Sequence, residues 1–530
     1  MQRDQNVRDF DFIIVGSGFG GSVSALRLAE KGYSVAVIEM GKRWEPEDYP
    51  ETNWILNKFL WAPLLSCYGF FRMTLLKDVF VLSGAGVGGG SLVYANTLPV
   101  PKDAAWEDPV WAELDDWKSV MPEFYATAKR MLGVAPFPRR TRADEIVEEY
   151  ARSIGTADTF EPAPVGVWFG EPGKEVPDPY FGGEGPTRTG CIQCGGCMVG
   201  CQHNAKNSLD KNYLYLAENR GVQIIPETRV TGLRPLEGGG YTLDVERSTS
   251  RFFKKRRTMT AGQVVLSGGV LGTVPLLMAC QHKGMLTNLS PQLGNFVRTN
   301  NEAIVGLSLR DDSEDFTDGV AITSKVALDE HTHLEPVRYS AGSDALSPLS
   351  TLLTDGGGSV PRGLRWVATC LRNPIDFART LWPFGWARKS LVLLVMQTIP
   401  GHMRVRMRRA WWWPFSLTLT SNAEGSKVPT YIPAANKAAR AIAEKHNAFA
   451  VSSVTEVLLD VPTTAHILGG CAMGRTPEDG VIDAQNRVHG HPGLYVIDGS
   501  MIGGNLGVNP SLTITALAER AMSFIEKKSV

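Results

Sequence analysis

The chain has 530 residues, and at roughly 150 residues per domain this length predicts two or three domains. Its 54 Lys and Arg residues nearly balance its 55 Asp and Glu residues, so the net charge of −1 gives no reason to expect a nucleic acid as partner. A hydrophobic content of 43% and a charged content of 21% exclude a chain that is disordered as a whole.

The first residues, MQRDQNVRDFDFIIVG, lack the basic and then apolar pattern of a secretory signal. We therefore expect a cytoplasmic protein whose eight cysteines do not form a disulfide scaffold. The apolar stretch 54–71 is interrupted by Asn57, Lys58, Pro63 and Gly69, too often for a membrane-spanning helix. It predicts a buried or interfacial segment of a soluble or peripheral protein.

A βαβ unit opens the chain, with strands expected over 11–16 and 35–39 and a helix over 22–31. The turn after the first strand reads Gly16-Ser-Gly18-Phe-Gly20-Gly21, and its glycines allow a pyrophosphate to approach the helix N-terminus. Glu39 ends the second strand, where its carboxylate can accept hydrogen bonds from a ribose diol. The unit predicts dinucleotide binding but does not separate NAD from FAD, and a tight turn without a ligand is the alternative.

Further along, a second glycine-rich loop spans Gly84–Asn96 and predicts backbone packed against a large flat or phosphorylated group; the alternative is a flexible surface loop. Later elements repeat the opening pattern of a buried strand followed by glycine and a helix. We expect strands over 223–230, 263–269 and 494–498, a hairpin over 403–420, and a helix over 511–526.

The two glycine motifs and three later segments resemble one family. The segments are GGVLGTVPLL at 268–277, HILGGCAMG at 466–474 and GVNPSLTITALAE at 507–519. Together they resemble the glucose–methanol–choline (GMC) flavoprotein oxidoreductases, and within that family the bacterial cholesterol oxidase-like subgroup. The resemblance implies an α/β (α+β) protein, with a Rossmann-like FAD-binding domain and a discontinuous, mainly antiparallel-sheet substrate-binding domain.

The same resemblance implies how the domains alternate along the chain. The FAD-binding domain would comprise 1–48, 79–100, 207–300 and 463–530, and the substrate-binding domain 49–78, 101–206 and 301–462. By the same similarity, the ADP half of FAD would be held by Gly16, Gly18, Gly20, Gly21 and Glu39. The residues beside the flavin would be Gly88, Gly89 and Asn96. Val230 would contact the adenine, and Asp498 would bind the ribityl chain.

The expected reaction is oxidation of a secondary alcohol by hydride transfer to flavin N5, which needs groups that orient the hydroxyl and take its proton. His466 and Asn509 match the family's catalytic His–Asn pair. Glu335 lies in a segment that resembles the one carrying the base for Δ5 to Δ4 isomerisation of a sterol. The alternative interpretation of Glu335 is a surface residue that forms an ion pair with Arg338. The alternative interpretation of His466, taken alone, is a buried histidine with a structural role.

Four of the eight cysteines lie in the loop 191–201, as Cys191-x2-Cys194-x2-Cys197-x3-Cys201. This is the ligand spacing of bacterial ferredoxins, with Gln202 in place of their proline, and it predicts a [4Fe–4S] cluster. Zinc is the alternative ligand, although zinc sites more often use two separated Cys-x2-Cys pairs, and reduced thiols or redox disulfides are the third interpretation. With a cluster, electrons would leave the flavin for a protein or quinone acceptor; without one, O2 would be the acceptor.

The expected substrate is the 3β-hydroxyl of a sterol or steroid. The alternatives are a bulky or long-chain apolar alcohol, or a flavin and iron–sulfur electron-transfer protein with idle His466 and Asn509. A sterol enzyme must reach lipid, and the hairpin tip Trp411-Trp-Trp-Pro-Phe415, flanked by arginines, is typical of a membrane interface. Because alternation is ordinary strand patterning, we expect a hairpin whose tryptophans cover the core. The alternative prediction is peripheral contact with the inner membrane.

Overall fold

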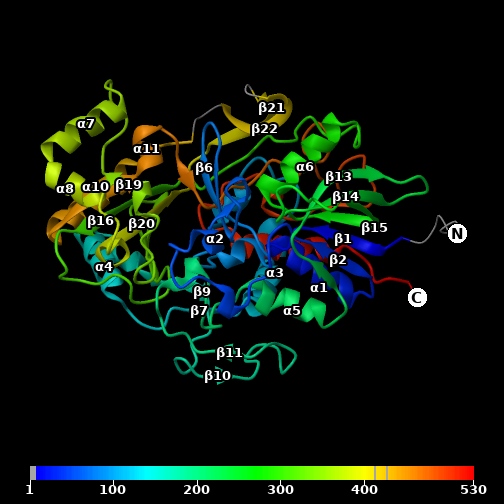
Figure 1. Cartoon of the computed structure of the whole chain (residues 1–530), viewed down its shortest axis with the longest axis horizontal. Coiled ribbons are helices and arrows are strands. Elements are labelled where there is room, and N and C mark those ends of the chain that lie inside the picture. The colour runs from blue at the N-terminus through cyan, green and yellow to red at the C-terminus, as the bar shows by residue number, and fades with distance from the viewer. Residues whose placement is uncertain (1–7, 411–412, 425–427, 530) are drawn as a thin grey trace.

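The computed structural model describes residues 8–410, 413–424 and 428–529. Two seven-stranded sheets, one on each side of the molecule, organise the chain (Figure 1). The fold class predicted from the sequence is confirmed: one sheet belongs to a Rossmann-like unit with helices, and the other is antiparallel.

The first sheet has the order β12–β2–β1–β15–β14–β13, with β25 also paired to β15. Its strands come from the N-terminal, middle and C-terminal parts of the chain: β1 (Phe10–Val15), β2 (Val35–Ile38), β12 (Gln223–Ile225), β13 (Thr228–Pro235), β14 (Tyr241–Arg247), β15 (Arg257–Leu266) and β25 (Leu494–Val496). The central strands pair in parallel, and both faces of β2 are buried, as expected for its continuous VAVI sequence.

The strand expected over 223–230 is two strands, which corrects the prediction. Pro226 has no backbone N–H to continue the ladder, and Glu227 has a φ of 52°, so the chain turns before β13 begins. β13 then pairs antiparallel with β14 while β12 pairs in parallel with β2.

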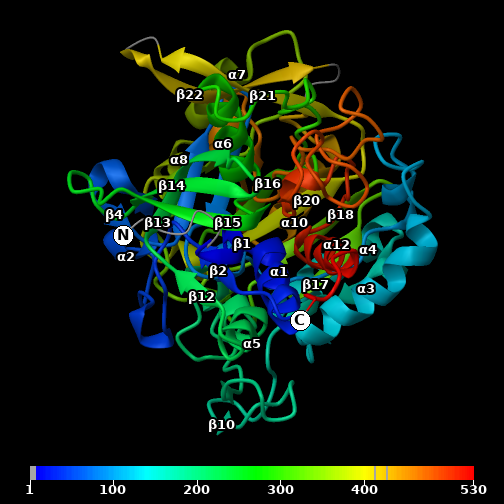
Figure 2. The same cartoon turned by 90° about the vertical axis from the view of Figure 1, so that its right-hand side faces the viewer.

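Helices cover the first sheet. The helix α1 (Phe19–Glu30) follows β1 and packs against α12 (Ser511–Ser523), so the two ends of the chain are held together (Figure 2). The other helices near this sheet are α3 (Trp117–Met131), α5 (Tyr213–Glu218) and α6 (Val270–His282).

The second sheet has the order β19–β23–β16–β20–β18–β17–β8, and every pairing in it is antiparallel. Its strands are β8 (Glu161–Pro162), β16 (Ala303–Leu309), β17 (Ser324–Ala327), β18 (Thr332–Val337), β19 (Ser350–Leu352), β20 (Ser390–Gln397) and β23 (Ala448–Ser453). The helices α4 (Arg142–Ile154) and α10 (Pro433–Lys445) share a hydrophobic core with it.

Smaller elements complete the chain. A three-stranded sheet, β24–β6–β5, is formed by β5 (Phe71–Leu75), β6 (Phe80–Gly84) and β24 (Thr463–Thr464). The remaining strand pairs are β3 (Trp61–Ala62) with β4 (Cys67–Tyr68), β7 (Val134–Pro136) with β9 (Pro164–Gly166), and β10 (Glu175–Val176) with β11 (Arg188–Thr189). The short helices are α2 (Leu56–Phe59), α7 (Arg362–Arg372), α8 (Pro374–Thr380), α9 (Trp386–Lys389) and α11 (Val454–Leu458).

The hairpin expected over 403–420 is confirmed as β21 (His402–Ala410) and β22 (Trp413–Glu424). Val405 and Met403 are buried, and the Val405 carbonyl lies close to Gly294, so this face packs on the rest of the protein. Trp411 and Trp412, on which the predicted membrane contact depended, lie outside the described residues.

Candidate active site

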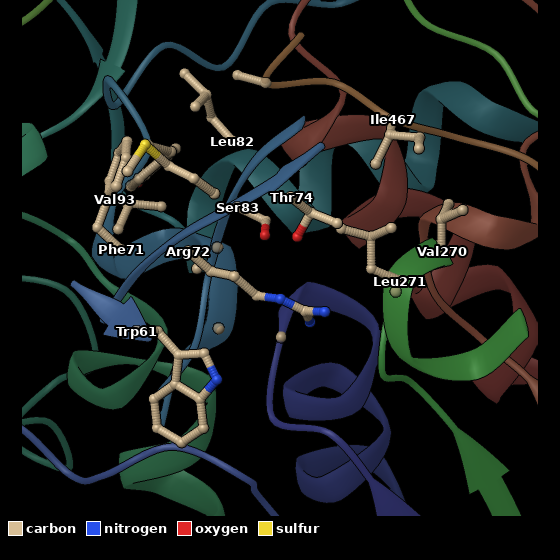
Figure 3. Close-up of a pocket in the computed structure, with 18 of the residues that line it drawn as sticks. Trp61, Phe71, Arg72, Thr74, Leu82, Ser83, Val93, Val270, Leu271 and Ile467 are labelled. Carbon is tan, nitrogen blue, oxygen red and sulfur yellow. The ribbon is translucent and has the colours of Figure 1, made fainter. Parts of the chain in front are cut away.

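A cavity of about 1190 Å³ reaches both large sheets. The glycine turn after β1, the hairpin β5–β6, the start of α6, and the segments that carry His466 and Asn509 all contribute to its wall. Figure 3 shows a part of it where Arg72 and Thr74 of β5 face Val270 and Leu271 of α6. The cavity therefore brings together the two glycine motifs that the sequence analysis assigned to FAD and the segments that carry the predicted catalytic pair.

The glycine turn is shaped by close backbone contacts. A Cβ atom at Gly20 would lie 1.8 Å from the carbonyl oxygen of Ile497, and one at Gly21 would lie 2.0 Å from the carbonyl oxygen of Gly16. A Cβ at Gly18 would meet nothing within 4 Å, because Gly18 faces the cavity. Gly20 and Gly21 are thus needed for packing, whereas Gly18 leaves room for a ligand at the N-terminus of α1.

The second glycine loop lies directly against the first. A Cβ at Gly89 would lie 2.7 Å from the Cα of Gly18, and the backbone N–H of Gly88 donates to the hydroxyl of Ser17 at 3.1 Å. The alternative of a flexible surface loop is therefore wrong, because the backbone of this loop forms part of the cavity wall.

Glu39 is buried at the end of β2, and its carboxylate accepts hydrogen bonds from the hydroxyl of Ser17 at 2.7 Å and from the N–H of Gly41 at 2.8 Å. Burial raises the pKa of Glu39, and these hydrogen bonds oppose that effect. Glu39 lines the cavity next to the turn, as predicted for a residue that meets a ribose.

The remaining predicted cofactor residues also lie at or near the cavity. Val230 and Asp498 line it, and the Asp498 carboxylate accepts hydrogen bonds from the N–H of Gly269 and the hydroxyl of Thr273 at the start of α6. Burial raises the pKa of Asp498. Asn96, in a left-handed conformation with φ of 66°, is fully buried beside lining residues, and neither atom of its amide has a hydrogen-bond partner. Such an orphaned amide is expected where a polar ligand completes the site.

Arg72 is a cavity residue that the sequence analysis missed. Its guanidinium group extends from β5 into the cavity (Figure 3), towards the turn that opens α1. It has neither an ion pair nor a hydrogen bond to any residue that the structure describes. Burial lowers the pKa of Arg72, and the nearby charge of Arg229 acts in the same direction. No motif surrounds Arg72, and the sequence analysis assigned residues 49–78 to the substrate-binding domain, so no signal in the sequence pointed to a cofactor contact here.

His466 and Asn509 come together although 43 residues separate them. The Nε2 atom of His466 lies 3.4 Å from the Nδ2 atom of Asn509, and both residues line the cavity. The other ring nitrogen, Nδ1, lies 2.9 Å from a carboxylate oxygen of Glu302, the residue just before β16. Glu302 is a second residue that the sequence analysis missed, because no local pattern marks it.

His466 and Glu302 shift each other's pKa. Burial by itself would lower the pKa of His466, but the Glu302 carboxylate outweighs this effect and raises the pKa above its ordinary value. Burial would likewise raise the pKa of Glu302, yet the imidazole and the hydrogen bonds from Thr464 and Ala465 hold it below its usual range. An ionised Glu302 accepts a hydrogen bond from Nδ1–H, so in neutral His466 the Nε2 atom carries the lone pair, which faces the Nδ2 group of Asn509.

Glu335 is buried behind Asn509. One of its carboxylate oxygens lies 3.4 Å from Asn509 Nδ2, and the other lies 3.7 Å from His333 Nε2. Arg338 points elsewhere and donates to Thr141 and Thr323, so the alternative of a surface ion pair between Glu335 and Arg338 is wrong.

The four cysteines of the loop 191–201 are free thiols, as are the other four of the chain. They line a separate cavity of about 150 Å³. Among the residues that the structure describes, which include this loop, no group of three or more His, Cys, Asp or Glu side chains converges on one metal ion.

Comparison with known proteins agrees with this arrangement. Sequence models described as GMC oxidoreductase match residues 187–285 and 405–518, and one described as an NAD(P)-binding Rossmann-like domain matches residues 14–44. A cholesterol oxidase from Acinetobacter baumannii is 47% identical over 532 residues, which cover 99% of this chain and 95% of that protein. A cholesterol oxidase from Mycobacterium tuberculosis (strain ATCC 25618 / H37Rv) is also 47% identical, over 98% of this chain and 92% of its own.

More distant proteins are also similar to this chain. The long-chain-alcohol oxidase FAO1 from Arabidopsis thaliana is 24% identical over 98% of this chain and 66% of its own length. The crystal structure of pyridoxine 4-oxidase from Mesorbium loti superimposes with a TM-score of 0.64 at 16% identity, covering 97% of this chain and 98% of that one.

A Rossmann-like turn, a second glycine loop against it, and a His–Asn pair in the same cavity define a flavoprotein oxidoreductase of alcohols. The chain belongs to the GMC oxidoreductase family, and FAD is its cofactor. The resemblance found in the sequence is thereby confirmed.

Proposed function

We propose that the protein oxidises the 3β-hydroxyl group of a sterol to a ketone. The identity of 47% to two cholesterol oxidases over nearly the whole chain supports this substrate class. The observation that carries the reaction type is the placement of His466 and Asn509 on one cavity wall, with Glu302 holding the histidine from behind.

The residues of the cavity fit FAD. The open side of Gly18, the orphaned amide of Asn96 and the unpartnered guanidinium of Arg72 offer contacts for a phosphorylated, ring-bearing ligand. We assign Arg72 to a phosphate of the cofactor, because a guanidinium binds phosphate through paired hydrogen bonds and this half-buried cation faces the cavity without a carboxylate partner in the described part of the chain. The Glu39 carboxylate would meet the adenosine ribose, Val230 the adenine and Asp498 the ribityl chain.

When bound, FAD supplies the ring nitrogen that accepts a hydride from the alcohol carbon. The chain's own residues handle the proton and the orientation. The Nε2 lone pair of His466 accepts the hydroxyl proton, and the negative charge of Glu302 stabilises the imidazolium that results. The Nδ2 group of Asn509, whose contacts with Glu335 and His466 are both 3.4 Å long, would donate a hydrogen bond to the substrate oxygen and hold it in place.

Glu335 is the proposed base for Δ5 to Δ4 isomerisation. Its carboxylate is buried, next to Asn509, and so lies close to the end of the substrate that carries the new carbonyl. A carboxylate excluded from water can carry a proton between two carbons of the same bound molecule.

Two acceptors can take the electrons from the reduced flavin. The names of the relatives favour O2. The thiols of Cys191, Cys194, Cys197 and Cys201 favour a [4Fe–4S] cluster and a one-electron acceptor, with zinc as the alternative metal.

Peripheral membrane contact would give a sterol enzyme access to lipid. In the part of the chain that is described, no helix is long and apolar enough to span a bilayer. The two helices α7 and α8 expose Leu371 and Ile375 to 76% and 68% beside basic side chains, and Leu64, at the large cavity, is 82% exposed. We propose that these apolar surfaces rest on a membrane, and Leu371→Glu with Ile375→Glu should reduce co-sedimentation with liposomes.

Substrate preference tests the proposed function. The holoenzyme, assayed with an artificial electron acceptor in detergent, should give its highest kcat/KM with a 3β-hydroxysterol and a much lower value with the 3α epimer. If the enzyme prefers long-chain primary alcohols to sterols, the proposed substrate is wrong and an aliphatic alcohol takes its place.

A further inference from the structure

The cavity beside the cysteine loop is too large for one ion and is bounded by all four thiols of the motif. Its volume of about 150 Å³ is several times the roughly 30 Å³ that a water molecule occupies in the liquid. Because the thiols surround a space and do not converge on a point, the arrangement suits a multinuclear group better than a single tetrahedral zinc ion.

Backbone N–H groups already face the sulfur atoms. The N–H of Gln193, a residue with a φ of 58°, donates to Cys191 Sγ at 3.3 Å. The backbone N–H groups of Gly196 and Ala321 lie against the thiols of Cys194 and Cys197. Hydrogen bonds to the ligand sulfurs are a common feature of protein iron–sulfur sites, where they help to set the reduction potential.

Three buried cations border the loop. Arg188, Lys206 and Arg338 are 1%, 4% and 1% exposed, and each lies within electrostatic range of Cys197 or Cys201. None of them has an ion pair with a carboxylate in the described part of the chain; they donate mainly to backbone carbonyls. Asp144 and Asp318 lie within electrostatic range of Arg338, and Asp210 lies within range of Arg188 and Lys206, but none of these carboxylates pairs directly with the cations. A cluster held by four thiolates is negatively charged, so these buried cations would stabilise it.

The loop also forms part of the wall between the two cavities. Met198 lines the large cavity, whereas its neighbours Cys197 and Val199 line the small one. The ammonium group of Lys206 joins the two sites, because it donates to the carbonyl of Cys197 at 2.8 Å and to those of Leu92 and Tyr94, in the second glycine loop, at 3.0 Å. On the outer side, Cys194 is exposed.

We propose that this cavity holds a [4Fe–4S] cluster, ligated by Cys191, Cys194, Cys197 and Cys201, which carries electrons from the flavin side at Met198 to the surface at Cys194. This inference rests on the proposed function. Each alcohol oxidised yields two electrons and two protons. The electrons pass singly through the cluster to two molecules of a one-electron carrier protein, and the protons are released to water. The protein would then act mainly as a dehydrogenase.

Metal and sulfide analysis of anaerobically purified holoenzyme tests this inference independently of activity. We expect about four iron atoms and four acid-labile sulfides per chain, a broad absorption beside the flavin bands that dithionite bleaches, and an electron paramagnetic resonance signal in the reduced state. Cys197→Ser should lose most of the iron and sulfide but retain FAD. Cys67→Ser, which changes a free thiol outside the loop, should retain both.

About one zinc atom per chain without sulfide, or neither metal nor sulfide in protein that carries FAD, would overturn the inference. If protein without iron and sulfide still oxidised sterols, the proposed function would be retained and only the cluster proposal would be wrong. If Cys197→Ser does not fold, Cys194→Ser at the exposed ligand provides the same comparison.

Discussion

The Nδ1 atom of His466 lies 2.9 Å from the Oε1 atom of Glu302, and the side chain of Glu302 is completely buried. The same carboxylate accepts hydrogen bonds from the hydroxyl of Thr464 at 2.6 Å and the N–H of Ala465 at 3.0 Å. Glu302 is therefore fixed by the segment that carries His466, and it fixes the tautomer of the imidazole in turn.

Replacing Glu302 by Gln should lower kcat by about 10²- to 10⁴-fold, because the imidazole loses both its orientation and the charge that stabilises its protonated form. The pH profile provides a second readout. Since the Glu302 carboxylate raises the pKa of His466, its loss should move the acid limb of kcat/KM to lower pH. Thr464→Val, which keeps the carboxylate, should change the rate much less. An unshifted acid limb in a folded, FAD-containing Glu302→Gln enzyme would contradict this role.

Arg72→Met should weaken FAD binding by about 10- to 100-fold, which corresponds to the roughly 1.5–3 kcal/mol of a hydrogen bond to a charged group. The measurement is a fluorescence titration of the apoprotein with FAD. The control is Arg152→Met, because Arg152 lies on the exposed side of α4, with a side-chain exposure of 61%. Equal FAD affinity in the two variants would show that Arg72 does not bind the cofactor.

Two neighbouring glycines should respond differently to alanine. Gly20→Ala places a Cβ 1.8 Å from the carbonyl of Ile497, so this variant should be strongly destabilised or insoluble. Gly18→Ala meets no protein atom within 4 Å and should keep its thermal stability as apoprotein while binding FAD more weakly, because the methyl group enters the cavity. Tight FAD binding by Gly18→Ala would show that no ligand approaches this residue.

Glu335→Gln should separate oxidation from isomerisation. The variant should still reduce its flavin with a 3β-hydroxy-5-ene sterol, but release the unconjugated 5-en-3-one instead of the conjugated 4-en-3-one. The ultraviolet absorption of the conjugated enone measures the difference directly. Unchanged formation of the conjugated product would assign the proton transfer to another group.

Local patterns in the sequence predicted the parts of the structure that local interactions determine. The glycine turn, Glu39 and the buried strands are close in sequence, so their spacing carries the information. Residues brought together by the tertiary fold were not predictable in this way. Glu302 lies 164 residues from His466, and Arg72 reaches the cavity only because β5 pairs with β6. Pro226 could have indicated the break between the two strands, but the residues on both sides favour a strand, so the sequence analysis predicted one continuous strand.

The central claim is that this cavity binds a flavin that accepts a hydride from a sterol held by His466 and Asn509. Anaerobic mixing of the FAD-containing enzyme with a 3β-hydroxysterol tests it most directly, with flavin absorbance as the readout and no acceptor present. We predict complete bleaching in the wild-type enzyme and bleaching at least about 100-fold slower in His466→Ala, which retains its FAD. A flavin that stays oxidised with every sterol and alcohol offered, or one that His466→Ala reduces at the wild-type rate, would contradict the account.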